Sequence, residues 1–198
     1  MSRLAYSILW VLAWALTRVL YRFRVENAER IPHRGAAVIV SNHPSYIDPV
    51  LLALTTRRRI RFAAAGWFCA RYPRLARLLQ LIPVQRGSSA VNRRMFSEVR
   101  RALEAGELVV IFPEGGLEFS GTLQAFQRGI ERIIAETPVP VVPIGVSGIW
   151  GSLLCEDPAL FWGRLRARVT VRVGHALPAS WVDREFLRAE VAALLPED

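Results

Sequence analysis

The sequence predicts one α/β domain, with a mixed and mostly parallel sheet flanked by helices and a hydrophobic helix at the N-terminus. Three observations favour this fold. Short apolar runs at residues 36–40, 81–84 and 107–112 are typical of buried strands, and segments with helical spacing separate them. Residues 165–173 alternate strictly between apolar and polar side chains, as a half-buried strand does. The chain has 198 residues, which suits one domain with a sizeable core.

Composition narrows the class of protein. Hydrophobic residues make up 52% of the chain, and the mean hydropathy of +0.24 is high for a soluble protein but low for one with several membrane spans. The formal net charge is +9, and every basic residue is arginine rather than lysine. A basic, apolar-rich chain suits an anionic membrane surface or nucleic acid. Because the arginines are scattered and form no recognised nucleic-acid motif, we expect no nucleic-acid partner.

The first helix carries an aromatic stripe. Residues 4–16 are apolar with one exception, and Tyr6, Trp10 and Trp14 recur every fourth residue, on one helical face. A full span needs about 20 apolar residues, which this run approaches only by including Arg18. We predict a helix at the membrane interface, with its aromatic side chains at headgroup level and arginines toward the phosphates. A cleaved signal peptide and a plain buried core helix are the alternatives.

We expect this helix to occupy residues 1–24 and the folded domain to occupy residues 25–198. Within that domain, the apolar patterns predict strands at 22–25, 36–40, 62–65, 81–84, 107–112, 139–146 and 165–173. Helices are predicted at 50–56, 67–79, 88–105, 127–136 and 183–195.

Prolines and charges refine three of these segments. Pro73 should break or restart the helix in which it lies, and Gly106 should stop the next one. The prolines within 139–146 indicate a strand that is partly irregular or at a sheet edge. Arginines take the outer face of residues 165–173, which favours an antiparallel or peripheral strand.

The segment after the strand at 36–40 carries the main candidates for chemistry. His43 and Asp48 lie on one short connection, where a neutral imidazole can act as a base and a carboxylate can orient it. Residues five apart on an ideal helix lie on different faces, so the pair can meet only across a loop or a distorted first turn. In the alternative interpretation, Asp48 caps a helix, and Asn42 and Ser45 are cap or turn residues.

Other predicted strands also end in residues suited to a binding site. Arg86 follows the strand at 81–84 beside a glycine, where it can hold an anion. Glu114 and Gly115 form a sharp turn after the strand at 107–112, and Pro143 lies in the strand at 139–146. Each of these alone also fits an ordinary turn or surface residue. Loops at one edge of an α/β sheet can nevertheless build a single site.

Taken together, these blocks resemble the glycerolipid acyltransferase family, typified by 1-acylglycerol-3-phosphate acyltransferase. That family carries Asn-His-x-Ser-x-x-Asp, which residues 42–48 match. An apolar strand ending at Arg86, the Phe-Pro-Glu-Gly of residues 112–115 and the Val-Pro of residues 142–143 resemble its other three blocks. The four blocks occur in order over about residues 36–148, which makes the combination more specific than any one of them.

The resemblance implies transfer of an acyl group from acyl-CoA or acyl carrier protein to a hydroxyl of a lysophospholipid, in phospholipid synthesis or remodelling. His43 would be the general base and Asp48 would orient it. The substrate-binding residues implied are Asn42, Ser45, Arg86, Glu114, Gly115 and Pro143. No metal and no cofactor are expected, and the two isolated cysteines predict neither a zinc site nor a disulfide framework. The protein would lie on the cytoplasmic face of an anionic membrane surface, peripheral or shallowly inserted.

The sequence departs from the family pattern after the third block. There the family commonly continues Thr-Arg-Ser, where the arginine helps to hold a phosphate, but here Gly116, Leu117 and Glu118 follow. Residues 129–134 and 148–152 look more like acyltransferase domains that reacylate lysophospholipids. Acylation of a non-glycerol lyso-lipid, or lipid binding at a membrane surface without catalysis, are the alternative functions.

Overall fold

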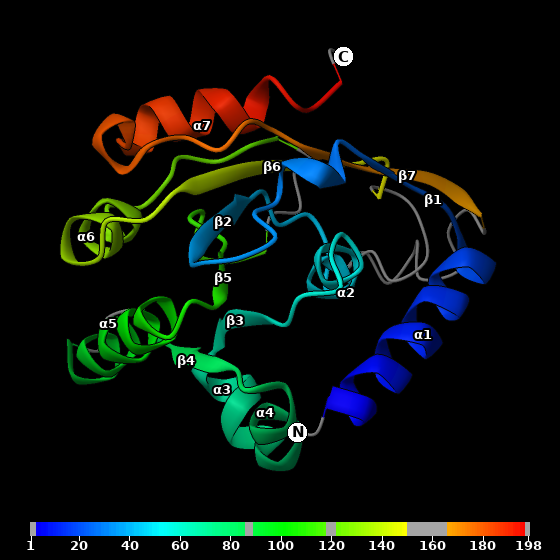
Figure 1. The fold of residues 1–198 in the computed structure, drawn as a ribbon, viewed down its shortest axis with the longest axis horizontal. Helices are drawn as coiled ribbons and strands as arrows, with labels where there is room; N and C mark the ends of the chain where they lie inside the picture. The colour runs from blue at the N-terminus through cyan, green and yellow to red at the C-terminus, as the bar shows by residue number, and fades with distance from the viewer. Residues whose placement is uncertain (1–2, 86–88, 118–121, 150–165, 197–198) are drawn as a thin grey trace.

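The structure is a computed structural model that describes residues 3–85, 89–117, 122–149 and 166–196. Seven strands form one sheet in the order β1-β7-β6-β2-β5-β3-β4 (Figure 1). Every neighbouring pair is parallel except β6 and β7, which are antiparallel. The strands are β1 Tyr21–Glu26, β2 Ala37–Ser41, β3 Ile60–Ala65, β4 Ile82–Val84, β5 Leu108–Ile111, β6 Val141–Ser147 and β7 Ala167–Val173. The predicted α/β fold with a mixed, mostly parallel sheet is confirmed.

The helices follow the predicted pattern. They are α1 Arg3–Leu20, α2 Asp48–Ala53, α3 Gly66–Arg71, α4 Pro73–Leu79, α5 Ser89–Glu104, α6 Gly129–Glu136 and α7 Arg184–Ala192, with short 3-10 turns η1 Ala28–Arg30 and η3 Ala179–Trp181. As predicted, Pro73 restarts a helix, because it opens α4 directly after α3 has ended. Gly106 follows α5 with a φ of 77°, a left-handed conformation that glycine adopts at low cost.

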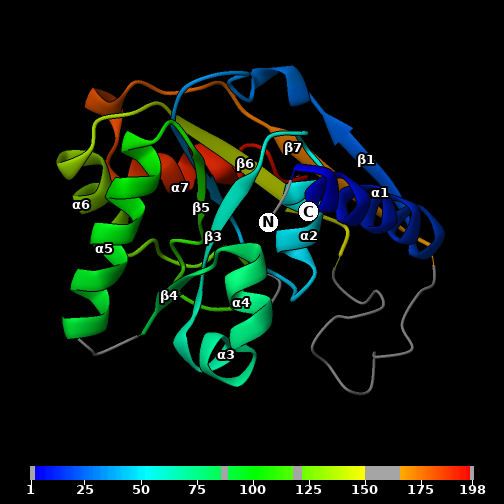
Figure 2. The ribbon, with the colours of Figure 1, turned by 60° about the horizontal axis from the view of Figure 1, so that its bottom comes forward.

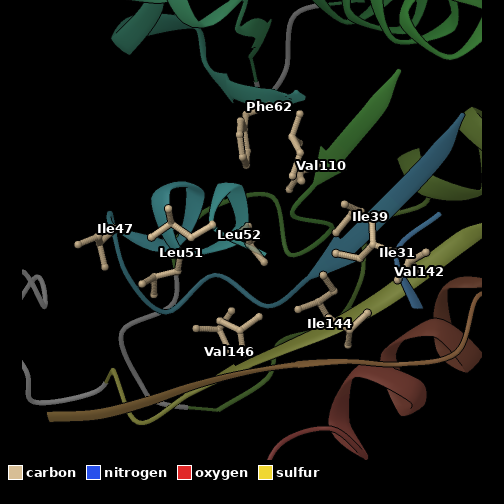
Figure 3. Packing of buried hydrophobic residues seen from close by; sticks show 14 of the residues in the cluster. Ile31, Ile39, Ile47, Leu51, Leu52, Phe62, Val110, Val142, Ile144 and Val146 are labelled. Carbon is tan, nitrogen blue, oxygen red and sulfur yellow. The ribbon is translucent and has the colours of Figure 1, made fainter. Parts of the chain in front are cut away.

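Two hydrophobic layers cover the sheet, one on each face. On one face, α5, α6 and α7 pack against alternate residues of the central strands, such as Val38 and Val40 of β2. On the other face, α1 and α2 pack against the intervening residues, such as Ile39. Figure 1 shows this separation, and Figure 3 shows side chains of the second layer between α2 and the strands. Burial on both faces explains why the central strands read as continuous apolar runs.

The prediction that residues 139–146 form an irregular or edge strand is wrong. β6 is continuous and lies between β7 and β2. Pro143 is tolerated there because its main-chain atoms point away from β2. Its carbonyl accepts a 2.8 Å hydrogen bond from the N–H of Gly174, so its nitrogen faces the same side, where β7 has already ended at Val173. The missing N–H therefore removes no bond between paired strands.

The first helix packs on the protein by the side that carries its first two aromatic residues. The Trp10 indole N–H donates to the carbonyls of Ala53 and Thr56, both at 3.1 Å, and the Tyr6 hydroxyl donates to the carbonyl of Arg58. The prediction that these two side chains lie at headgroup level is therefore wrong. The exposed side is aliphatic instead and consists of Ile8, Leu9, Val11, Leu12, Leu16 and Val19, with Trp14 beside it.

Two further observations concern this N-terminal region. Within the described ranges, no helix is long and apolar enough to cross a bilayer. The chain passes from α1 straight into β1, which pairs with β7 along its whole length. The boundary predicted after residue 24 therefore falls inside a strand of the sheet.

Candidate active site

His43 lies at the carboxyl edge of the sheet, two residues after β2 ends. A loop then leads to α2, whose first residue is Asp48. The imidazole Nδ1 of His43 and Oδ2 of Asp48 are 2.9 Å apart. The sequence required a loop or a distorted turn between the two residues if they were to meet, and the structure has such a loop. His43 keeps 16% of its side chain exposed, whereas Asp48 has none.

The Asp48 carboxylate is bound through one of its two oxygens. Oδ2 accepts the main-chain N–H of Ser45 at 2.8 Å in addition to the imidazole. Oδ1 is buried and accepts no hydrogen bond from the described residues. Burial raises the pKa of Asp48, and its hydrogen bonds with His43 and Ser45 act in the opposite direction. The carboxylate is thus held in place by two donors at a cost in desolvation.

The alternative interpretation of Asp48 as a helix cap is wrong. The residue that precedes the first turn of α2 is Ile47, and no side chain caps the helix there. Asp48 is instead the first residue of the helix, and its side chain turns back toward the loop to meet His43. Two other parts of that interpretation are confirmed, since Pro49 lies in the first turn of α2 and Ser45 is a turn residue whose carbonyl accepts the N–H of Asp48.

Three contacts fix the orientation of the His43 ring. An ionised Asp48 can only accept, so Nδ1 carries the hydrogen and Nε2 is left with its lone pair. The ring also stacks on Phe112, with centroids 3.9 Å apart and planes 13° from parallel. Its main-chain N–H donates to Oε1 of Glu114 at 2.8 Å. Since no described residue bonds to Nε2, this atom is available to a substrate hydroxyl.

Glu114 joins three segments rather than projecting into solvent. Its side chain is buried, and its second oxygen accepts the main-chain N–H of Gln124 at 2.9 Å. One carboxylate therefore ties the loop after β2 to the turn after β5 and to the segment before α6. Gly115, the next residue, has a φ of 77°, and its N–H closes the turn onto the carbonyl of Phe112. This conformation favours glycine at that position.

Asn42 extends the pairing of β2 with β6. Its amide nitrogen donates to the carbonyl of Val146 and its amide oxygen accepts the N–H of the same residue, both at 2.8 Å. The side chain thus acts as one more peptide unit of β2. Both of its polar atoms bond within the protein and fix the end of β2 next to His43, and the substrate contact expected from the sequence stays a prediction.

The remaining predicted site residues lie in different places. Ser45 is buried in the loop, where its hydroxyl accepts the N–H of Ile47 at 3.4 Å. Pro143 packs beside Gly174 and Leu194, on the face of the sheet that α7 covers. His43 stacks on Phe112, which packs against the other hydrophobic layer, so Pro143 lies away from His43 and its contact with substrate stays a prediction. Arg86 lies outside the described residues.

Sequence reasoning missed part of this arrangement. Phe112 was recognised as a member of its block, but its stacking on His43 was not predicted. The only signal for it in the sequence was the position of Phe112 at the end of a predicted strand. Gln124 and Val146 contribute through main-chain atoms, which leave no signal in a single sequence. Among the described residues, no three His, Cys, Asp or Glu side chains gather to hold a metal ion.

Comparisons with known proteins agree with this geometry. A family model described as Acyltransferase matches residues 22–147. The human protein named 1-acyl-sn-glycerol-3-phosphate acyltransferase alpha is 30% identical over 165 residues, which are 77% of this chain and 56% of that protein. A chloroplastic 1-acyl-sn-glycerol-3-phosphate acyltransferase of Arabidopsis thaliana, LPAT1, is 26% identical over 147 residues, which are 68% of this chain and 39% of that protein. The chain thus spans about half the length of such relatives or less.

A solved structure shares the fold. The 1-acyl-sn-glycerophosphate (LPA) acyltransferase PlsC from Thermotoga maritima superposes with a TM-score of 0.76. The match covers 95% of this chain and 77% of that chain at 20% sequence identity.

Proposed function

This chain belongs to the acyltransferase family, and we propose that it moves a fatty acyl group from acyl-CoA or acyl carrier protein to the free hydroxyl of a lysophospholipid. The observation that carries the proposal is the contact between His43 and the buried Asp48, 2.9 Å from Nδ1 to Oδ2. It leaves Nε2 as the basic atom, with the ring held by Phe112 and the main chain held by Glu114. A surface that only binds lipid has no need of an oriented base.

In the proposed reaction, His43 removes the proton of the acceptor hydroxyl as the oxygen attacks the thioester carbonyl carbon. Asp48 holds the imidazole in the tautomer with hydrogen on Nδ1 and stabilises the imidazolium that forms. The tetrahedral intermediate then expels the thiolate by breaking the carbon–sulfur bond. The imidazolium returns its proton to the thiolate, so the products are the ester and a free thiol. No acyl-enzyme forms, and the step needs neither metal nor cofactor.

Two acceptors follow from different observations. The relatives named above are 1-acyl-sn-glycerol-3-phosphate acyltransferases, which favours lysophosphatidic acid. The residues after Gly115 lack the arginine that would help to hold a phosphomonoester, which favours another lysophospholipid in a remodelling reaction. Glu114 is fully used inside the protein, so it would shape the acceptor site through the His43 main chain rather than by touching the acceptor. Arg86 remains the proposed phosphate ligand.

The first helix supports a location at a membrane surface. Its exposed side is aliphatic from Ile8 to Val19, about three turns of helix, and Arg18 lies over the ring of Trp14 at 5.2 Å, near its C-terminal end. An amphipathic helix of this kind can lie in the headgroup region of an anionic bilayer. Because acyl-CoA and acyl carrier protein are intracellular donors, the proposed location is the cytoplasmic face.

The test is thioester consumption by the purified full-length chain in liposomes, with a panel of lyso-lipids and both donors. His43→Ala should lower turnover by about 10²–10⁴-fold, the range for removal of a general base. His33→Ala is the matched control, because His33 is exposed in the turn before β2, at the opposite edge of the sheet. Substantial turnover by a folded His43→Ala variant would exclude the mechanism. If the wild type consumed no thioester across the panel with either donor, the result would instead favour lipid binding at a membrane surface without catalysis.

A further inference from the structure

The helices α3 and α4 form a hairpin that the protein leaves almost uncovered. Neither helix contains a buried residue, and five large side chains of the hairpin are exposed: Trp67, Tyr72, Leu75, Leu78 and Leu79. Trp67 is 64% exposed, more than any large apolar side chain elsewhere in the described residues. Figure 2 shows the hairpin beside β4, at the margin of the fold. Helices of six and seven residues are marginal without apolar burial.

The exposed apolar residues of α4 share one side of the helix. Leu75, Leu78 and Leu79 have the spacing of three and four residues that aligns side chains along a helix. Arg74 and Arg77 are exposed next to this stripe. An apolar stripe bordered by arginines is the pattern of a helix that lies in a membrane interface, with its arginine stems along the acyl region and the guanidinium groups at the phosphates.

The charge of the surrounding sequence is entirely positive. Between Asp48 and Glu98 the chain contains no acidic residue, although it contains ten arginines. Three of them, Arg71, Arg74 and Arg77, lie in the hairpin and are exposed. Such a segment is complementary to anionic lipid headgroups, which attract each nearby arginine.

The hairpin also lies where a membrane contact would serve the candidate active site. α3 begins directly after β3, which runs parallel to the central strands, so Trp67 lies at the same edge of the sheet as His43. Arg59 connects the hairpin to the first helix, because its guanidinium lies over the Tyr6 ring at 5.4 Å and donates to Gln80, just after α4, at 3.3 Å. The C-terminal end of α4 and the N-terminal part of α1 are therefore neighbours.

We propose that α3 and α4 are a second membrane contact, separate from α1, which inserts Trp67, Leu75 and Leu78 into the headgroup region of an anionic phospholipid bilayer. With two contacts rather than one, the orientation of the protein is fixed and the carboxyl edge of the sheet faces the lipid. The inference rests on the proposed function in one respect only, that the acceptor is a lipid of the bilayer.

The test is co-sedimentation of the full-length chain with vesicles of phosphatidylcholine, with and without phosphatidylglycerol. Trp67→Gln should weaken partitioning roughly fivefold, and Trp67→Gln with Leu75→Gln and Leu78→Gln by more than about tenfold, because less apolar surface enters the interface. Trp181→Gln is the matched control, since Trp181 is 62% exposed but lies before α7, which packs on β6 and β2 rather than on β3 and β4. It should leave partitioning unchanged.

The charge contribution has its own pair of variants. Arg74→Gln with Arg77→Gln should weaken binding by about fivefold for each arginine on vesicles with phosphatidylglycerol and have little effect on phosphatidylcholine alone. Arg100→Gln with Arg101→Gln removes the same charge from the exposed surface of α5, and this control should bind as the wild type does.

Unchanged partitioning of the apolar triple variant would overturn the proposal and favour an acidic protein as the partner of the hairpin. An equal loss in the two tryptophan variants would overturn it as well, since no particular surface would then be involved. Turnover of a short-chain acceptor that is monomeric in water separates this inference from the proposed function. The hairpin variants should retain that turnover, whereas its absence in the wild type would count against the proposed function and leave the binding result standing.

Discussion

The two edges of the sheet are each held by charged side chains that cross from loop to loop, but the charges have opposite sign. At the carboxyl edge, Glu114 and Asp48 accept main-chain N–H groups from the loops around His43. At the amino edge, Arg58 donates to three main-chain carbonyls, those of Pro32, Gly35 and Gly106, at 2.6, 2.7 and 2.8 Å. Carboxylates therefore accept hydrogen bonds from N–H groups at the carboxyl edge, and a guanidinium donates hydrogen bonds to carbonyls at the amino edge.

The direction of the chain favours this difference. In an α/β fold with parallel strands, helices begin at the carboxyl edge, with free N–H groups, and end at the amino edge, with free carbonyls. Asp48 opens α2, whereas Gly106 follows the end of α5. The two edges differ in a second way, because Arg58 has three acceptors whereas Asp48 keeps one buried oxygen without a donor among the described residues. The three bonds of Arg58 stabilise the amino edge, whereas the buried Asp48 carboxylate lowers stability at the carboxyl edge, a cost that the proposed reaction would explain.

Asp48→Asn is the strongest test of this difference between the two edges. We expect turnover to fall by about 10³–10⁴-fold, because an amide no longer holds the imidazole in the required tautomer. The free energy of unfolding should stay at the wild-type value or increase, because the change removes a buried charge with an unsatisfied oxygen. Thioester kinetics and urea unfolding measure the two effects. A fall in stability together with activity would mean that Asp48 serves the fold as much as the chemistry.

Glu114→Gln should affect both properties by smaller amounts. The amide has one acceptor oxygen in place of two, so either the His43 N–H or the Gln124 N–H loses its partner. We expect kcat to fall roughly 10–100-fold through misplacement of His43 and stability to fall by about 1–2 kcal/mol. The pH profile of kcat should keep its shape, since Glu114 positions His43 without exchanging a proton. A shifted acidic limb in that profile would contradict this role.

The amino edge should give the opposite result. Arg58→Met should lower the free energy of unfolding by about 1.5–3 kcal/mol, because three carbonyls at a partly exposed site lose a charged donor, and kcat should be unchanged. The free energy of unfolding of Arg58→Lys should lie between those of the wild type and Arg58→Met, since an ammonium cannot reach three acceptors in the geometry of a guanidinium. Arg34→Met is the matched control, because Arg34 is exposed in the same turn. Equal losses in Arg58→Met and Arg34→Met would refute the role given to the three bonds.

The smallest expected effect is a dependence of stability on pH. Burial raises the pKa of Asp48 in the folded state above the unfolded value of 3.8. The folded state therefore binds the proton more tightly, and stability from this group is lost as pH rises through the interval between the two values. The stability advantage of Asp48→Asn should grow across that interval by at most about 1.4 kcal/mol per pH unit and then level off. A constant difference from pH 3.5 to 8 would show that the folded-state pKa is not raised.

The sequence predicted the elements and the contact between His43 and Asp48, because both depend on local patterns. Strands buried on both faces produce apolar runs, and the position of His43 just after such a run placed it at the edge of a parallel sheet. The breaks at Pro73 and Gly106 followed from backbone chemistry alone.

The direction in which side chains point could not be predicted in the same way. Whether Pro143 faces α7 or His43 depends on the register of β6 against β2, which is a non-local property. Tyr6 and Trp10 face inward because they donate hydrogen bonds to carbonyls at the end of α2 and before β3, which only the fold brings near them. In the sequence, Glu114 fits a solvated turn residue. Only the fold brings the N–H groups of His43 and Gln124 within hydrogen-bond distance of its carboxylate.

The hydrogen bonds of Asn42 with Val146 affect how the reacting group is prepared for its reaction. They extend the sheet by one residue through a side chain, so that His43, the proposed general base, is the first residue beyond the hydrogen-bonded sheet. The main chain at His43 therefore has little freedom left to lose when a substrate arrives. In the proposed reaction, the entropy of ordering the base is lost once, when the chain folds, so it adds nothing to the barrier of each turnover. In this sense the buried amide of Asn42 would supply preorganisation to the proposed base.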